Sequence, residues 1–243
     1  MIVFPAIDIL GGRAVRLSQG DYARVTVYNE DPVAQARLFA EQGAEWLHVV
    51  DLDGARDGVP GNIGVVERII AEVGLPVQTG GGIRSLDTMQ RLSDAGVSRM
   101  VLGTKLATDR EFVLEAVSRF GSSVTAGIDA RDGMVAIEGW REGTVTPASE
   151  LVRELSGLGI RHLVYTDISR DGMQTGVNVD AYEVIAEEAG FPIIASGGIS
   201  ALEDLNALAA LGPDVIEGAI TGRALYEGAF KLKHAIRAGR GEL

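Results

Sequence analysis

The chain carries one stretch twice: TGGGIRSLDTM at residues 79–89 returns as ASGGISALEDL at residues 195–205. Its glycine pair recurs after 116 residues, from Gly81 and Gly82 to Gly197 and Gly198. Three more recurrences follow in the same order along the chain, at offsets of 121, 116 and 119 residues: Asp8 with Asp129, Asp51 with Asp167, and Gly103 with Gly222. Recurrence at about half the chain length predicts two fused halves, at about residues 1–121 and 122–243.

Short segments rich in Val, Ile and Leu alternate with segments of helical period along the whole chain. They are apolar at consecutive positions, which is typical of parallel strands covered on both faces. Eight such segments occur, at residues 2–8, 46–52, 75–81, 99–104, 124–129, 162–168, 191–198 and 215–220. With about eight helices between them, they predict an α/β protein with a single (β/α)8 barrel domain over residues 1–243. A doubly wound open sheet is the alternative, and the repeat favours the barrel.

Helix boundaries can be read from local signals. Asp31 followed by Pro32 predicts a first turn, and the capping boxes Thr108 to Glu111 and Ser200 to Glu203 predict two more. Glycine just past the last apolar residue of a helix predicts a helix end, and it occurs at Gly43, Gly96, Gly159, Gly190 and Gly212.

Charge and composition limit the partners of this chain. A net charge of −12 argues against nucleic acid and against acidic membrane surfaces, because Lys and Arg supply the affinity for phosphate backbones. The absence of cysteine excludes disulfides, thiolate metal sites and a cysteine nucleophile. The first residues, MIVFPAIDILGG, lack the features of a signal peptide, and no apolar run approaches the length of a membrane span. We therefore expect a cytoplasmic monomer that acts on a small molecule.

Aspartates follow several of the predicted strands. The active site of a parallel barrel is built at the carboxyl ends of its strands. The first and fifth strands lie on opposite sides of an eight-stranded ring, so Asp8 and Asp129 are expected to face each other across its mouth. Two carboxyl groups in a partly desolvated pocket can differ in pKa, so that one accepts a proton and the other donates one. For Asp51 and Asp167, capping of the next loop is the favoured interpretation.

The repeated glycines predict phosphate binding. Each pair ends a strand before a helix, where backbone amides can hold an anion that a side chain would keep away. The segments LGTKL and TGRAL follow the fourth and eighth strands in the same way. Two anion pockets on opposite rims imply a ligand with a phosphate at each end. The residues proposed to bind it are Gly81, Gly82, Gly103, Thr104, Gly197, Gly198 and Gly222, with Arg84, Lys105 and Arg223 as assisting cations.

The three histidines give no metal site. His48, His162 and His234 are too few and too dispersed to bind a metal together. We expect His48, within a predicted strand, to be a hydrogen-bonded core group.

Motifs over essentially the whole chain resemble a known family. PAIDILGGRAVRLSQGDY, HVVDLDGA, GGGIR, GIDARDG, YTDISRDGMQTGVN, IIASGGIS and GRALYEG are similar to segments of the phosphoribosylformimino-aminoimidazole carboxamide ribotide isomerases of histidine biosynthesis. The resemblance implies a barrel that converts an aminoaldose bisphosphate to the aminoketose by an Amadori rearrangement, without a metal or an organic cofactor. It implies that Asp8 is the general base, that Asp129 is the general acid and that Thr166 assists.

The same resemblance suggests further substrate-binding residues. Asp171 and Gly172 belong to the motif YTDISRDGMQTGVN, and Trp140 occupies the place of a lid that stacks on the substrate. Trp140 is expected in a long loop after the fifth strand, where packing of the barrel top is its alternative role. Arg16, in the first long loop, could reach a carboxamide or carboxylate of the ligand, or pair with a surface acid such as Asp21.

Three other functions stay open from the sequence. The cyclase subunit of imidazole glycerol phosphate synthase has the motif PCLD where this chain has PAID, and it requires a partner that supplies ammonia. A bifunctional isomerase would also act on phosphoribosylanthranilate, but Glu138 before Gly139 and Trp140 would oppose the anthranilate carboxylate. A phosphosugar-binding barrel without catalytic activity is the third alternative.

Overall fold

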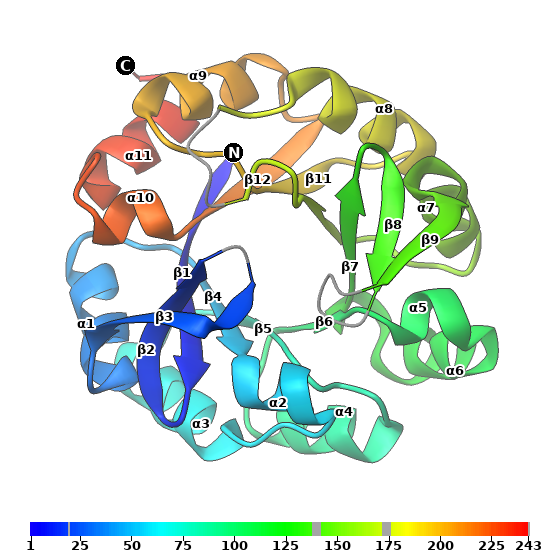
Figure 1. Ribbon diagram of the computed structural model, residues 1–243, viewed down its shortest axis with the longest axis horizontal. Coiled ribbons are helices and arrows are strands. Elements are labelled where there is room, and N and C mark those ends of the chain that lie inside the picture. Colours follow the sequence, from blue (N-terminus) through cyan, green and yellow to red (C-terminus); the bar gives the residue numbers. More distant parts are fainter. Residues whose placement is uncertain (19, 138–141, 172–175, 243) are drawn as a thin grey trace.

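The protein, seen here as a computed structural model, is described over residues 1–18, 20–137, 142–171 and 176–242. Parallel strands close into a ring that confirms the predicted (β/α)8 barrel (Figure 1). Each of the eight predicted strands is present, in the ring order β1 (Ile2–Leu10), β4 (Leu47–Asp51), β5 (Val77–Gly80), β6 (Arg99–Leu102), β7 (Val124–Arg131), β10 (Leu163–Asp167), β11 (Ile193–Ser196) and β12 (Ile216–Thr221). Pairing of β12 with β1 completes the ring.

Helices surround this ring on the outside (Figure 1). Outward strand residues such as Val3, Val49, Val77 and Met100 pack with the helices in one large buried cluster. None of the helices within the described ranges has the length and apolar character needed to cross a membrane. The helices are α1 (Pro32–Glu41), α2 (Leu52–Asp57), α3 (Ile63–Val73), α4 (Leu86–Asp94), α5 (Lys105–Thr108), α6 (Arg110–Phe120), α7 (Ala148–Gly157), α8 (Val179–Ala189), α9 (Leu202–Ala210), α10 (Arg223–Tyr226) and α11 (Leu232–Gly239), with a 3-10 turn at Gly121–Ser123.

Two predicted helix starts are displaced by one residue. Asp31 caps α1 as expected, since its side chain accepts a hydrogen bond from the Val33 amide. At α6, however, the capping side chain is Asp109, not Thr108. At α9, the Asp204 carboxylate, not Glu203, accepts from the amides near the start of the helix. At both starts an aspartate next to the expected residue takes its place, and the Thr108 hydroxyl donates to the Thr104 carbonyl instead. The glycines expected at helix ends all have positive φ: Gly43, Gly96, Gly159, Gly190 and Gly212.

A β hairpin extends the barrel after its first and fifth strands. β1 runs on into β2 (Arg13–Ser18) and β3 (Asp21–Asn29), and β7 runs on into β8 (Met134–Ile137) and β9 (Glu142–Pro147). Arg16, predicted in a long loop, therefore lies in strand β2. Hairpins at corresponding places in the two halves support our hypothesis of a duplicated half-barrel.

A cluster of charged and polar side chains crosses the barrel interior near the amino ends of the strands. Arg99 on β6 forms an ion pair of 2.6 Å with Glu217 on β12, and these two strands are not neighbours in the ring. The pair therefore crosses the interior. The Arg99 guanidinium also lies 4.7 Å from the centre of the Trp46 ring. His162 Nδ1 lies 3.0 Å from Glu217.

Candidate active site

A pocket opens at the carboxyl ends of the barrel strands, and all eight strands of the ring contribute to its lining. Its volume of about 340 Å³ is in the range of small-molecule sites. Each predicted site residue that the structure describes lines it: Asp8, Arg16, Gly81, Gly82, Arg84, Gly103, Thr104, Asp129, Thr166, Asp171, Gly197, Gly198, Gly222 and Arg223. Trp140 and Gly172 lie outside the described residues, as do Glu138 and Gly139.

Asp8 and Asp129 enter the pocket from opposite sides of the ring. They lie on β1 and β7, four strands apart in either direction. Thr166 on β10 is the register partner of Asp129. One pocket therefore holds two carboxyl groups and a hydroxyl, as the sequence predicts.

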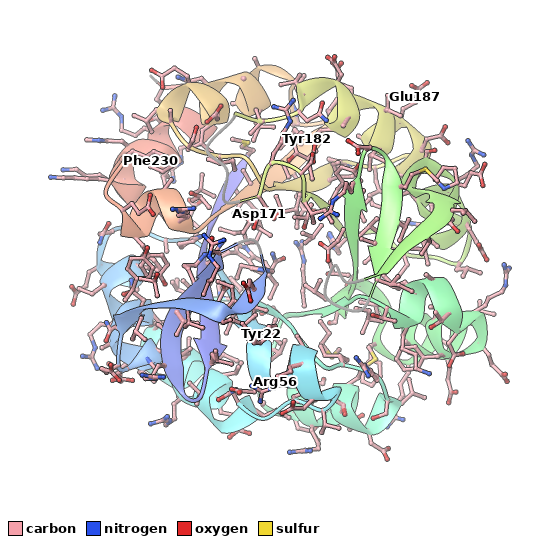
Figure 2. The ribbon with its side chains drawn as sticks, viewed as in Figure 1. Tyr22, Arg56, Asp171, Tyr182, Glu187 and Phe230 are labelled. Atoms are coloured by element: carbon pink, nitrogen blue, oxygen red, sulfur yellow. The ribbon has the colours of Figure 1, made fainter. Side chains whose placement is uncertain are left out.

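Arg16 binds the Asp8 carboxylate directly. Its Nη1 donates to Asp8 Oδ2 at 2.8 Å, so the alternative pairing with Asp21 is not seen. Burial raises the pKa of Asp8, the positive charge of Arg16 opposes this rise, and the nearby Asp171 adds to it. Figure 2 shows Asp171 and Tyr22 on opposite sides of the ring opening, Asp171 toward β12 and Tyr22 toward β5. The carboxylate is thus held in a buried site by one cation.

Asp51 and Asp167 organise loops, which agrees with the favoured interpretation. The Asp51 carboxylate accepts hydrogen bonds from the amides of Gly54, Gly61 and Asn62 and from the Asn62 side chain. Asp167 binds the Asn178 side chain at 2.9 Å in the matching place of the other half.

The glycine pairs are needed for a reason that differs from the expected one. A Cβ on Gly81 would lie 2.1 Å from the Asp51 carbonyl oxygen, and one on Gly197 would lie 2.6 Å from that of Asp167. Both glycines have positive φ. The backbone of the preceding βα loop therefore leaves no room for a side chain, whether or not a ligand is bound. Neither pair lies at a helix start: α4 begins at Leu86, after its N-cap Ser85, and α9 begins at Leu202.

Gly81→Ala is expected to destabilise the fold by at least about 1–3 kcal/mol, because alanine resists this φ and meets backbone. For a chain of this size that corresponds to about 2–4 °C of Tm per kcal/mol in thermal unfolding. The control is Gly64→Ala in α3, where no other atom lies within 4 Å of an added Cβ. That variant should gain about 0.5–1 kcal/mol. Equal Tm values for the two variants would contradict the close approach at Gly81.

Two of the three expected cations at the rims, Lys105 and Arg223, form ion pairs within the protein. Lys105 Nζ lies 2.7 Å from Asp109, and Arg223 Nε lies 2.7 Å from Glu227. Each pair joins the first residue of a short helix to the residue just after its end. These helices, α5 and α10, begin directly after Gly103–Thr104 and Gly222 at the pocket wall, with no side-chain cap. The two halves therefore present similar rims.

The pocket also contains residues that the sequence did not identify as functional. His48 is the hydrogen-bonded core group we expected, but it also lines the pocket. Burial, reinforced by the charge of Arg16, lowers the pKa of His48 to about 3, so its ring is neutral at ordinary pH. Tyr22 lines the pocket from β3 and donates from its hydroxyl to the Leu52 carbonyl at 2.8 Å. For His48 the sequence does carry a signal, because His48 and Val50 are two residues apart in a predicted strand and therefore share one face of it.

Known proteins resemble this chain over almost its whole length. A sequence model of the family described as Histidine biosynthesis protein matches residues 2–231. The chain is 50% identical over 236 residues to the 1-(5-phosphoribosyl)-5-((5-phosphoribosylamino)methylideneamino)imidazole-4-carboxamide isomerase of Syntrophus aciditrophicus, covering 97% of this chain and 98% of that protein. It is 51% identical over 236 residues to the Moorella thermoacetica protein of the same name, with 97% of each chain covered. For the Syntrophotalea carbinolica protein of that name, identity is 46% over 242 residues, with 100% of both chains covered.

Proposed function

The chain belongs to the histidine biosynthesis protein family, and from this premise we propose that it is the isomerase that its relatives are named for. Its reaction moves a phosphorylated aminosugar from the aldose to the ketose form. The observation that carries the proposal is the placement of Asp8 and Asp129 on opposite strands around one pocket. The relatives described above are named as isomerases, which favours this function over the cyclase and over the phosphosugar-binding barrel.

Proton transfers by the two aspartates account for the chemistry. Asp129 in its protonated form donates to the ribose ring oxygen as the C1–O bond breaks, which leaves a Schiff base. Asp8 then removes the proton from C2, which gives an enolamine. The enolamine becomes the ketose when C1 takes up a proton and the C2 hydroxyl gives one up, so that no proton is gained or lost over the whole reaction. Thr166, beside Asp129 in register, is proposed to orient that carboxyl group or the ring oxygen.

We propose that the two phosphates bind at opposite rims of the pocket. One rim consists of Gly81, Gly82, Gly103 and Thr104, and the other of Gly197, Gly198, Gly222 and Arg223. Backbone amides can hold an anion in a protein with a net charge of −12, because they need no basic surface. Arg84 adds a cation to the first rim, while Asp171 belongs with the acid-base groups near Asp8.

A direct assay tests the proposal. Purified protein is given the aminoaldose bisphosphate, and in parallel phosphoribosylanthranilate, with and without ammonia. We expect conversion of the first substrate alone, independent of ammonia. Binding without turnover would support the phosphosugar-binding barrel, and turnover of phosphoribosylanthranilate would show a bifunctional enzyme.

Arg16→Met is expected to move the acid limb of the kcat/KM profile to higher pH. The Arg16 cation opposes the rise in the pKa of Asp8, so its removal raises that pKa further. A base must be deprotonated to act, hence the limb follows its pKa upward. Measurement of kcat/KM from pH 4 to pH 9 checks this, and an unchanged limb would show that Asp8 does not set it. Arg153→Met, at an exposed ion pair with Glu188, is the control and should leave the profile in place.

Location and assembly are also proposals. We propose a cytoplasmic protein that acts as a monomer, on a substrate that is a small molecule. Sedimentation velocity of the purified chain tests the monomer, and a second species that grows with concentration would contradict it.

A further inference from the structure

A glutamine inside the barrel touches the histidine of the pocket wall. Gln78 on β5 and His48 on β4 are register partners on neighbouring strands. Gln78 Nε2 lies 2.9 Å from His48 Nδ1. Gln78 is fully buried and is not part of the pocket lining, whereas His48 is. The glutamine can therefore act on a ligand only through the histidine.

The surroundings of Gln78 orient its amide. The strand order β4, β5, β6 puts Gln78 between His48 and Arg99, and Arg99 is its register partner on the other side. Arg99 points into the barrel, because it reaches Glu217 across the interior. Gln78 Oε1 and Arg99 Nη1 are both buried without a hydrogen-bond partner among the described residues. No hydrogen bond joins these two atoms, so Arg99 acts on the amide through its charge alone. An acceptor oxygen turned toward the strand of that cation is favourable, whereas a reversed amide would turn its NH2 donors toward it.

With this orientation, only one tautomer of His48 fits. The ring is neutral, as its lowered pKa of about 3 requires, so it carries a single proton. Nδ1 faces the NH2 group of Gln78 and must accept from it. The proton is then on Nε2. This is the ring nitrogen that Gln78 does not occupy, and it can donate to a ligand in the pocket that His48 lines.

We propose that Gln78 is a positioning residue that fixes the tautomer of His48, so that the imidazole offers an Nε2–H donor to a ligand in the pocket. The orienting chain runs from Arg99 through Gln78 to His48, across three adjacent strands. A neutral imidazole can donate a hydrogen bond to a phosphosugar oxygen, and unlike an imidazolium it carries no second proton that could pass to Asp8. Only the kinetic consequence rests on the proposed isomerase function, because the tautomer is a property of the protein alone.

Nuclear magnetic resonance measures the tautomer directly. Long-range 1H–15N correlation spectra of protein labelled at histidine distinguish a protonated ring nitrogen from an unprotonated one. The chain has three histidines, and loss of one signal set in His48→Asn assigns His48. We expect Nε2 protonated and Nδ1 unprotonated in the protein without substrate. A protonated Nδ1, or an even mixture of tautomers, would overturn the proposal whatever the protein catalyses.

Two substitutions at Gln78 test the cause. Gln78→Glu offers only acceptors once ionised beside Arg99, so Nδ1 should become protonated. Gln78→Leu removes the hydrogen bond at similar size, and the tautomers should then exchange and give averaged shifts. A His48 spectrum unchanged in Gln78→Leu would show that another group fixes the tautomer of the ring. This variant tests the proposal even if the buried glutamate of Gln78→Glu impairs folding.

Thr125→Val is the matched control, because Thr125 Oγ1 is also a buried atom without a described partner. It should leave the His48 shifts and the kinetics as they are. In Gln78→Leu and Gln78→Glu, kcat/KM should fall roughly 2- to 10-fold, the effect of about one net hydrogen bond. Altered tautomers with unchanged kcat/KM would contradict a role in the reaction, while no turnover in any variant would contradict the isomerase function and leave the tautomer result standing.

Discussion

Asp8→Asn is expected to lower kcat by about 10²–10⁴-fold, the usual contribution of a general base. Asparagine keeps the shape of the side chain and still accepts from Arg16, but its amide cannot take the proton from C2. Substrate affinity should change little, because the phosphates at the two rims provide the anchoring. Steady-state kinetics give kcat, and calorimetric titration with substrate gives Kd.

The control for Asp8 is a carboxylate outside the pocket. Asp94→Asn lies on α4, where the exposed Asp94 accepts from Gln90 at 2.7 Å. Its kcat should stay within about twofold, since it removes one solvent-exposed interaction. A kcat of Asp8→Asn within tenfold of the unchanged protein would exclude Asp8 as the base. A large rise in Kd instead would indicate that the pair with Arg16 shapes the pocket.

The barrel was predictable because its signals are local and repeated. Each buried strand is a continuous apolar run, and most helices are followed by a glycine whose φ is positive, as at Gly43 and Gly190. The carboxyl ends of parallel strands meet at one face. This rule alone brought residues as distant in sequence as Asp8 and Asp129 to one pocket.

The hairpins were missed although their turns are visible in the sequence. Gly11 and Gly12 have φ of 57° and 76°, and Asp132 and Gly133 have φ of 52° and 77°. A Gly-Gly or Asp-Gly pair with positive φ at both residues is the signature of a tight hairpin turn. Each segment is predicted as a long loop between a barrel strand and the next helix, because a βα unit has a helix after its strand. Arg16 was therefore placed on a loop, although it is held on β2 beside Asp8.

Pairings across the ring could not be predicted from the sequence. The bond between Gln78 and His48 depends on the register of β5 against β4. A shift of one residue would turn one of the two side chains out of the barrel. The ion pair of Arg99 with Glu217 further requires a closed ring of a given diameter. Such contacts depend on geometry that no short motif encodes.

Asp129→Asn is expected to lower kcat by about 10²–10⁴-fold as well, because the amide cannot release a proton to the ribose ring oxygen. The two aspartates are distinguished by pH. An acid must be protonated to act, so loss of the acid should remove the basic limb of the kcat profile, whereas loss of the base should remove the acidic limb. Replacement by valine should give the same kcat as asparagine, if proton donation is the whole contribution.

The double variant gives the sharpest test of shared chemistry. If Asp8 and Asp129 act on successive steps of one reaction, the slower step in each single variant limits turnover. The double variant should then lose less than the product of the two single losses, because residues that act as a unit are not additive. Fully multiplicative losses would mean that the two carboxyl groups act independently, for instance one in binding and one in catalysis. Such a result would leave the pocket as described and remove one of the two aspartates from the acid-base pair.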